Sequence, residues 1–388
     1  MIYLTFLIPI VTCLVLFFKF RKETVWWEYL LVFIPSVGAS FLTEHIMIRY
    51  NTHDTEYHGS YAVAVRHYDT WNEWIHRTCY RTVRVGKHTR HIPYDCSYCK
   101  THHEYWVAIE SSGKERRISR SDYQKLANLW GTQEQFIDMH RRYYTKDGDA
   151  QQYAWNRQPL HALTFTDSHS YENPTQAAST LYRFSDVTPE DVKDFGLQEY
   201  PKEYHIDCYG VTREDHRPIL GSKVSEEAQR TFQFINGYYG KKHQFRMYVC
   251  LFPDGSASQA EKQRELWKGG NKNELVVCIG TDKSASRVKW ASTFSWCDDT
   301  SMEVYLKQYL AGCDSLNLVD LGVKVVDGLQ SGKWHRKNFE DFKYIKVEMT
   351  EAQYIWFFII IVLLNIGVSA FVVLNDIRNE DYYFKYRY

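Results

Sequence analysis

The sequence predicts a three-layer α/β domain and a smaller α+β module, both anchored by transmembrane helices. Tyr354–Leu374 is an apolar run without a charged residue, and it is as long as a helix that crosses a hydrocarbon layer of about 30 Å. The N-terminus is also apolar, and helix and strand patterns alternate after Thr188. The expected domains are 1–48 (two transmembrane helices), 49–185 (a module rich in cysteine, histidine and aromatic residues), 186–350 (the α/β domain) and 351–388 (a third transmembrane helix and a cytoplasmic tail).

Composition limits the classes of function. Acidic and basic residues balance at 47 each, so no overall field attracts nucleic acid, and we expect no nucleic-acid partner. The 30 Tyr, 21 Phe and 12 Trp suit either a thick aromatic core or a binding surface. The sequence contains no G-x-S-x-G, H-E-x-x-H, Walker loop or G-x-G-x-x-G motif. The composition therefore leans against an enzyme and leaves the question open.

The N-terminal part predicts one or two further membrane helices. Ile2–Phe18 is apolar, and its basic residues follow the apolar run instead of preceding it, which indicates an uncleaved helix and not a signal peptide. Trp26–Leu42 is apolar too, although Glu28, Pro35 and Gly38 interrupt it. This second segment is either a full span or a helix lying at the interface.

Basic residues near the spans predict the orientation. Lys19–Lys22 should be cytoplasmic, and three crossings would put the tail with Arg378, Lys385 and Arg387 on the same side. The large middle, about 49–350, would then lie outside the cytoplasm, on a periplasmic or extracellular side. If the second segment does not cross, the middle becomes cytoplasmic.

The module 49–185 shows strand patterns at Ser60–Tyr68 and Glu104–Glu110. Ser119 with Asp122 predicts a helix that Gly131 ends, and Thr132 with Gln135 predicts a second helix containing Phe136, Met139 and Tyr143. The stretch from Thr145 to about Thr180 has little periodicity. We expect it to be rich in loops, with the join between modules near residue 185.

The α/β domain shows helix starts at Thr188-Pro-Glu-Asp191, at Ser225 (ending at Asn236-Gly237) and at Thr300 with Glu303. Glu274–Gly280 is a continuous apolar run typical of a strand buried on both faces. The remaining expected elements are strands at Tyr204–Tyr209, Phe245–Phe252 and Val288–Trp296, and helices at Ala260–Trp267 and Leu316–Leu329.

The sharpest local cluster is Cys79, Cys96, Cys99 and His102. Thiolates and an imidazole at C-x2-C-x2-H spacing can supply the four ligands of a structural zinc ion. In an oxidising compartment Cys79 would instead form a disulfide with Cys96 or Cys99. Free thiols and a redox pair of Cys96 with Cys99 are further alternatives. The basic residues Arg81, Arg84, Lys87 and Arg90 of the same loop are more typical of a solvated face than of a binding site.

Asp298 and Asp299 form a second candidate site, after a strand and just before a helix. Adjacent carboxylates at a strand end can hold Ca²⁺ or Mg²⁺ through oxygen ligands, and Asp282 could join them. The alternative is an acidic helix start, which stabilises the helix dipole.

Residues 218–335 resemble the TPM domain family, whose members are α/β domains that are often tethered to membranes outside the cytoplasm. Ala260–Trp267, Gly269-Gly270 and Glu274–Gly280 resemble that family's helix, Trp/Gly turn and buried strand. The resemblance implies membrane-protein repair, assembly or acid phosphatase roles, with the family's following strand and acidic helix start at Phe294–Asp299. The chain departs from the family where Ser295-Trp296-Cys297 replaces a glycine-rich strand end. As a whole it is similar to uncharacterised membrane proteins encoded by tailed phages.

These observations predict an integral membrane protein that displays an extracytoplasmic binding or assembly platform and is not an enzyme. Its partners would be the lipid bilayer and a protein of the membrane or envelope. The alternative is a metal-dependent phosphatase or other hydrolase that uses Asp298 and Asp299. A module stabilised by a purely structural zinc ion is compatible with the first hypothesis.

Overall fold

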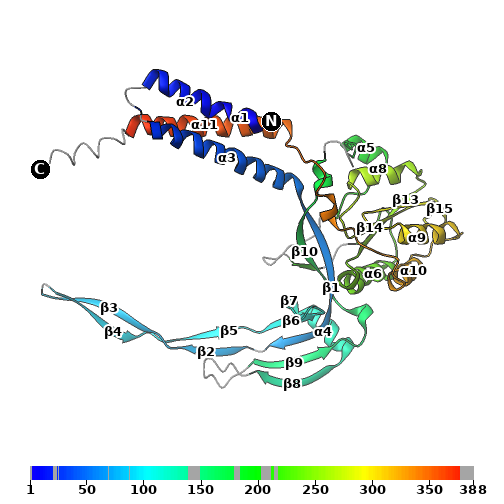
Figure 1. Cartoon of the computed structure of the whole chain (residues 1–388). Helices are drawn as coiled ribbons and strands as arrows, with labels where there is room; N and C mark the ends of the chain where they lie inside the picture. Colours follow the sequence, from blue (N-terminus) through cyan, green and yellow to red (C-terminus); the bar gives the residue numbers. More distant parts are fainter. Residues whose placement is uncertain are drawn as a thin grey trace, which may run out of the picture. The chain divides into compact units, whose positions relative to one another are not determined.

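The structure is a computed structural model that describes residues 2–20, 24, 26–68, 70–86, 88–138, 149–178, 184–201, 211–213 and 217–375 (Figure 1). It divides into two compact units. Unit 1 comprises 1–54, 170–185 and 338–388, and unit 2 comprises 55–169 and 186–337. Both modules expected from the sequence therefore contribute to unit 2, while unit 1 is assembled from three separate stretches of the chain.

Unit 1 contains the long apolar helices. These are α1 (Ile2–Thr5) with α2 (Leu7–Phe20), α3 (Trp26–Thr52) and α11 (Glu351–Asn375). Three stretches, Tyr3–Phe20, α3 and most of α11, are long and apolar enough to cross a membrane. This confirms the three apolar helices expected from the sequence, and the second is longer than its apolar core because it continues to Thr52.

The helices of unit 1 pack as an antiparallel bundle. Phe357 and Ile361 of α11 pack near Ala39 and Met47 of α3, whereas Val372, towards the other end of α11, packs with Val32. Where α3 ends and α11 begins, the side-chain amides of Asn51 and Gln353 exchange two hydrogen bonds of 2.8 and 2.6 Å. These two hydrogen bonds link the end of α3 to the start of α11.

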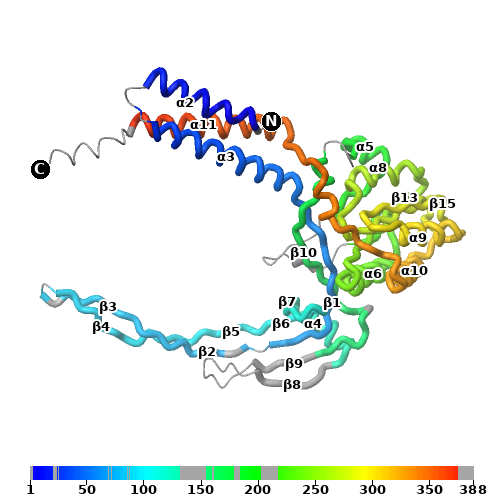
Figure 2. The backbone as a smooth tube through the Cα atoms, in the orientation of Figure 1, coloured from blue at the N-terminus to red at the C-terminus, as the bar shows by residue number. Residues whose placement is uncertain are grey.

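The middle segment of unit 1, residues 170–185, is hydrogen-bonded to the chain just after α3. The backbone passes from α3 into strand β1 (His53–Tyr68) without a loop (Figure 2). Asp54 accepts hydrogen bonds from Tyr171 and Asn173, at the end of strand β10 (Thr164–Glu172) and just after it. The short helices η2 (Pro174–Ala177) and η4 (Phe339–Phe342) lie in the same unit.

The α/β part of unit 2 has three layers. Its sheet has the order β12 (Ile219–Leu220), β13 (Arg246–Pro253), β14 (Glu274–Thr281) and β15 (Val288–Ser295), with the first three strands parallel and β15 antiparallel. One face packs against α6 (Glu226–Phe234), α9 (Ser301–Ala311) and α10 (Leu318–Gln330). The other packs against α5 (Pro189–Asp194) and α8 (Ser258–Leu266). The layering agrees with the sequence, and every residue of β14 is buried as its apolar run predicts.

The three helix starts predicted in this part are confirmed, although one of them lacks its predicted capping box. Thr188 and Asp191 form a capping box, and Ser225 caps α6. Helix α9 also begins after Thr300 as predicted, but the expected capping box is absent, because Glu303 accepts hydrogen bonds from Thr293 and Ser295 of β15. The helix from Ser225 also does not end at Asn236-Gly237; it continues through a π-helical turn, η3 (Ile235–Tyr239), into α7 (Gly240–His243).

The rest of unit 2 is built on a seven-stranded sheet with the order β11–β10–β1–β6–β7, in which β9 also pairs with β1 and with β8. Helix α4 (Arg120–Trp130) packs on it through Tyr123, Leu126 and Trp130, and it begins and ends at Ser119 and Gly131 as predicted. The remaining elements are β6 (Tyr105–Glu110), β7 (Glu115–Ile118), β8 (Thr132–Asp138), β9 (Asp149–Trp155), η1 (Pro159–His161) and β11 (Val211–Arg213).

The helix predicted from Thr132 is wrong, because residues 132–138 form strand β8 and pair with β9. Its capping signal is local, whereas pairing with β9 satisfies the whole backbone of the segment. The stretch from Thr145 contains strands β9 and β10, which the sequence pattern did not reveal. Met139, Tyr143 and the strand expected at Tyr204–Tyr209 lie outside the described residues.

Strand β1 is fixed to the α/β part by close backbone packing and by buried charge. A Cβ atom on Gly59 would come within 1.9 Å of the carbonyl oxygen of Asn236 in η3. Glu56 lies three residues before Gly59 on β1. Its buried carboxylate contacts Arg336 at 2.8 Å, Lys272 at 3.1 Å and His58 at 3.1 Å. These contacts hold the two parts of unit 2 together.

Candidate docking surface on a disulfide-stapled hairpin

A long two-stranded hairpin leaves the β1 side of unit 2 (Figure 1). Its first half pairs β2 (Trp71–Ile75) with β5 (Tyr98–His102), and its second half pairs β3 (Thr78–Val85) with β4 (His88–Asp95). Each half forms a two-stranded sheet of its own. At about 3.3 Å per residue, the ribbon from Trp71 to Val85 is roughly 50 Å long.

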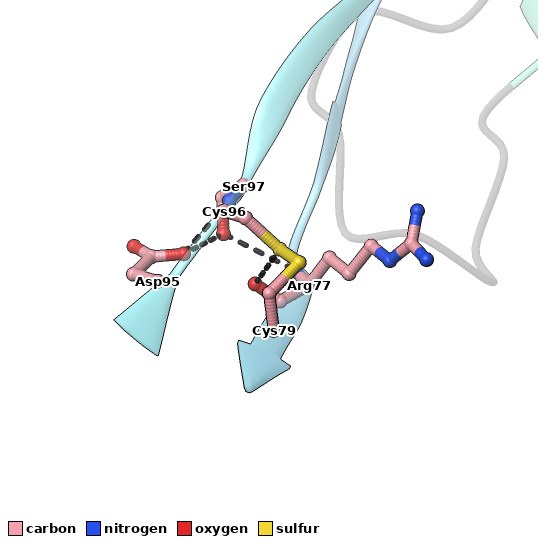
Figure 3. The surroundings of a disulfide bond; sticks show 5 residues. All are labelled: Arg77, Cys79, Asp95, Cys96 and Ser97. Carbon is pink, nitrogen blue, oxygen red and sulfur yellow. Dashed lines mark hydrogen bonds between the residues drawn. A yellow bond between two sulfur atoms is a disulfide. The ribbon is translucent and has the colours of Figure 1, made fainter. Parts of the chain in front are cut away.

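A disulfide between Cys79 and Cys96 closes the hairpin at the junction of its two halves (Figure 3). Next to it the Cys96 N–H donates to the Arg77 carbonyl at 2.9 Å, and Asp95 accepts hydrogen bonds from the backbone and the hydroxyl of Ser97. These bonds from Ser97 lower the pKa of Asp95. Of the alternatives that the sequence left open for Cys79, the structure contains the disulfide with Cys96.

The other members of the predicted zinc cluster have different surroundings. Cys99 is an exposed free thiol on β5, directly opposite Trp74. The His102 ring lies 2.8 Å from Glu73 of β2. Zinc binding by Cys79, Cys96, Cys99 and His102 would require the reduced thiols, and it stays a prediction for the reduced protein. Because Cys96 is bonded to Cys79, the structure does not contain the redox pair of Cys96 with Cys99.

The two faces of the β3–β4 half differ in chemistry. On one face Arg81 lies directly opposite Ile92, Val83 opposite Arg90, and Cys79 opposite Tyr94. On the other, Tyr80 lies opposite Pro93 and Thr82 opposite His91, with a 3.1 Å hydrogen bond between that threonine and histidine. The first face therefore alternates guanidinium groups with apolar side chains, whereas the second carries mainly hydroxyl and ring groups, together with Arg84 and Asp95.

The hairpin exposes side chains that proteins usually bury or pair. All eight residues of β4 are exposed, and so are Trp74, Tyr80 and Tyr98, at 52%, 67% and 48% of their surface. Within the described part of the chain, the exposed side chains of Arg81, Arg84 and Arg90 form no ion pair. No Asp or Glu occurs between Trp74 and Tyr94, a stretch with five basic residues: Arg77, Arg81, Arg84, Lys87 and Arg90.

An open hollow of about 410 Å³ lies beside the disulfide, where the two halves meet. Its lining combines an aromatic ring, a guanidinium group and a carboxylate with smaller polar groups. The lining residues are His76, Arg77, Thr78, Pro93, Tyr94, Asp95 and Ser97.

The hairpin has little intrinsic stability of its own. An isolated two-stranded ribbon is marginal in water, because it has no packed face to offset its conformational entropy. Closing the 17-residue separation with a disulfide adds about 3 kcal/mol. An exposed ribbon that is covalently stapled, aromatic and basic is therefore a surface available for a partner.

Asp298 and Asp299, the acidic pair that the sequence singled out, each interact with other groups of the protein. Asp299 accepts from the Ser301 N–H at 2.8 Å and lies 3.2 Å from His335, while Asp298 pairs with Lys337 at 2.9 Å. The Ser301 bonds lower the pKa of Asp299. Asp282 closes its own loop through Ser284, Ser286 and Arg287. Each carboxylate thus has its own partners, and a Ca²⁺ or Mg²⁺ site there stays a prediction.

Two other groups, the carboxyl of Glu274 and the half-buried thiol of Cys297, look chemically active but have structural surroundings. Glu274 is fully buried; burial raises its pKa, although hydrogen bonds from Asn271 and Tyr200 oppose the rise. Burial likewise raises the pKa of Cys297 to about 11, so its thiol stays protonated and is a poor nucleophile.

The sequence contained a signal for the hairpin that the interpretation of this loop did not use. Thr78–Asp95 is rich in strand-forming residues, and Gly86, with positive φ, provides the turn. The cysteine spacing drew attention to metal chemistry, whereas the alternation of arginine with Val83, Ile92 and Tyr94 was the pattern of a surface.

Comparisons with protein families, with curated proteins and with solved structures found no match to this chain.

Proposed function

We propose that this protein is a membrane-anchored platform that presents its hairpin, outside the cytoplasm, to a binding or assembly partner. The observation that carries the proposal is the hairpin itself, with exposed aromatic residues and arginines that form no ion pair. Aromatic and arginine side chains are the groups most enriched in the energetic centres of protein interfaces. The platform is not an enzyme, and its partner is a component of the membrane or envelope.

Three features support the placement outside the cytoplasm. Basic residues flank the predicted cytoplasmic ends of the helices. The disulfide is of the kind that persists in oxidising compartments. The resemblance of residues 218–335 to TPM domains implies the same side. The hydrolase alternative at Asp298 and Asp299 stays a prediction, which metal titration of the purified protein would test.

Thiol labelling tests the placement. Among the described free cysteines only Cys99 is exposed. In a Cys208→Ser background, a membrane-impermeant maleimide added to intact cells should label Cys99, and a Cys99→Ser variant should not be labelled. Labelling only after the cells are opened would overturn the extracytoplasmic display.

Photocrosslinking tests the docking role. A photoreactive residue replacing Tyr80 or Tyr94 in native membranes should form one discrete adduct that disappears when the Cys79–Cys96 disulfide is reduced and alkylated. The matched control is Leu129 on α4, which is 41% exposed but lies outside the hairpin. Equal crosslinking from Leu129, or none from either tyrosine, would contradict the proposal.

A further inference from the structure

We infer that the β3–β4 half of the hairpin docks on an anionic phospholipid surface, through the face that carries Arg81, Val83, Arg90, Ile92 and Tyr94. This inference rests on the proposed function, because it names the partner of the same hairpin. It also concerns a surface that is independent of the three membrane helices.

The first step is charge. The chain as a whole is neutral, yet five basic residues and no acidic one lie between Trp74 and Tyr94. Arg81, Arg84 and Arg90 are exposed and without an ion pair among the described residues. A second copy of the same hairpin is disfavoured as partner, since like charges facing one another across paired strands are destabilising. The partner must therefore be anionic.

The second step is the arrangement of apolar groups. Arg81 lies directly opposite Ile92, and Arg90 directly opposite Val83, so each guanidinium group has an aliphatic neighbour on the same face. Tyr94 continues this face next to the disulfide. At the boundary between lipid headgroups and acyl chains, apolar groups insert while arginines reach the phosphates and tyrosine stays at headgroup level.

The third step is availability. Three helices of this chain are long and apolar enough to span a bilayer, so a chain inserted in this way tethers the hairpin covalently to a lipid surface. Tethering raises the effective concentration of a second contact, and a modest affinity for lipid is then sufficient. An acidic protein would satisfy the charge but does not require the alternating aliphatic groups, so the observations favour lipid.

The test uses the full-length protein in nanodiscs of zwitterionic phosphatidylcholine, with added vesicles of phosphatidylcholine alone or with a third of phosphatidylglycerol. Flotation should show binding to the anionic vesicles only. Because one basic side chain near an anionic surface contributes roughly a fivefold gain, Arg81→Gln with Arg90→Gln should weaken binding roughly thirtyfold at low salt. The matched control, Arg157→Gln with Arg230→Gln, removes two exposed arginines outside the hairpin and should leave binding unchanged.

Vesicle binding at high salt separates the contribution of the apolar side chains from that of the charged ones. Ile92→Ser should weaken binding to anionic vesicles several-fold even at high salt, because insertion of an aliphatic group is not screened. Intact mass should show the Cys79–Cys96 disulfide in every variant, which excludes loss of the hairpin fold. If the control variant loses as much binding as Arg81→Gln with Arg90→Gln, the inference is overturned.

A soluble polyglutamate peptide distinguishes failure of the lipid inference from failure of the proposed docking function. Binding of the peptide without binding of the vesicles would overturn lipid as the partner but keep the hairpin as a docking surface for an acidic protein. Binding of neither, together with the absence of a crosslink from Tyr80 and Tyr94, would overturn both the lipid inference and the proposed function.

Discussion

Single residues in this protein fix how β1 meets the α/β part. Gly59 allows the strand to touch the π-helical turn η3, and a methyl group there would overlap the backbone of Asn236. Glu56 on the same strand has a carboxylate that is almost completely buried among cationic partners. Neither role is visible in the sequence, because both depend on residues that are far away along the chain.

We expect Gly59→Ala to destabilise unit 2 by about 3 kcal/mol or more, because the atoms that it would meet belong to backbone and cannot rotate away. Gly312→Ala is the matched control, since a Cβ there meets nothing closer than 3.5 Å. Hydrogen exchange of the β13 amides measures the effect. Similar protection in the two variants would show that η3 yields easily.

The lowered pKa of Glu56 predicts that the folded protein loses stability in acid. Burial alone would raise its pKa, but the hydrogen bond from His58 and the charges of His58, Arg336 and Lys272 outweigh burial and lower the pKa to about 2. The folded-state pKa lies below the unfolded value, so this stabilisation is complete above about pH 4.5 and is lost as the pH falls towards 2.

Glu56→Gln should accordingly cost about 3 kcal/mol at pH 7, because it buries a neutral amide beside two half-buried cations that lose their carboxylate. The difference from the wild type should shrink below pH 4.5, which denaturant unfolding at several pH values measures. Glu115→Gln removes the more exposed pair with Arg66 and should cost less than about 1 kcal/mol. A cost for Glu56→Gln that does not change with pH would rule out the ionic explanation.

Within the part of the chain that the structure describes, the hairpin is the element pair that a disulfide closes. The Cys79→Ser/Cys96→Ser variant should lose about 3 kcal/mol of local stability in β3 and β4. Hydrogen exchange should become fast in these strands, while β13 and β14, buried in the three-layer sheet, keep their protection. Equal loss in both regions would mean that the hairpin is part of the global folding unit.

Elements with a signal inside their own sequence were predictable, and those decided by distant partners were not. The apolar run of β14, the caps at Ser119, Thr188 and Ser225, and the long run of α11 all carry local physical signatures. Residues 132–138 instead follow strand β9, and Glu303 bonds to β15 in place of its own helix start.

For the candidate site, the sequence predicted a cysteine cross-link but not which side chains share a face of the hairpin. Cysteine spacing indicated a cross-link near Cys79, and the disulfide confirms one of the alternatives. Which side chains share a face depends on the register of β3 with β4, so the combination of Arg81, Ile92 and Tyr94 emerges only from the paired strands.

At the scale of the whole molecule, the two units are interleaved along the chain. Unit 1 draws on the beginning, the middle and the end of the chain, whereas unit 2 uses the two long stretches in between. Reasoning from local periodicity divides a chain into consecutive segments, so it could not anticipate a unit assembled from three pieces.

The interrupted course of unit 1 also has a consequence for biogenesis. A ribosome makes α2 and α3 first and α11 last, with nearly all of unit 2 in between, so tens of seconds of synthesis separate the helices that must pack together. During that interval Val32 and the amide of Asn51 have no α11 to cover or bond them. A product that ends before α11 would retain this uncovered helix pair.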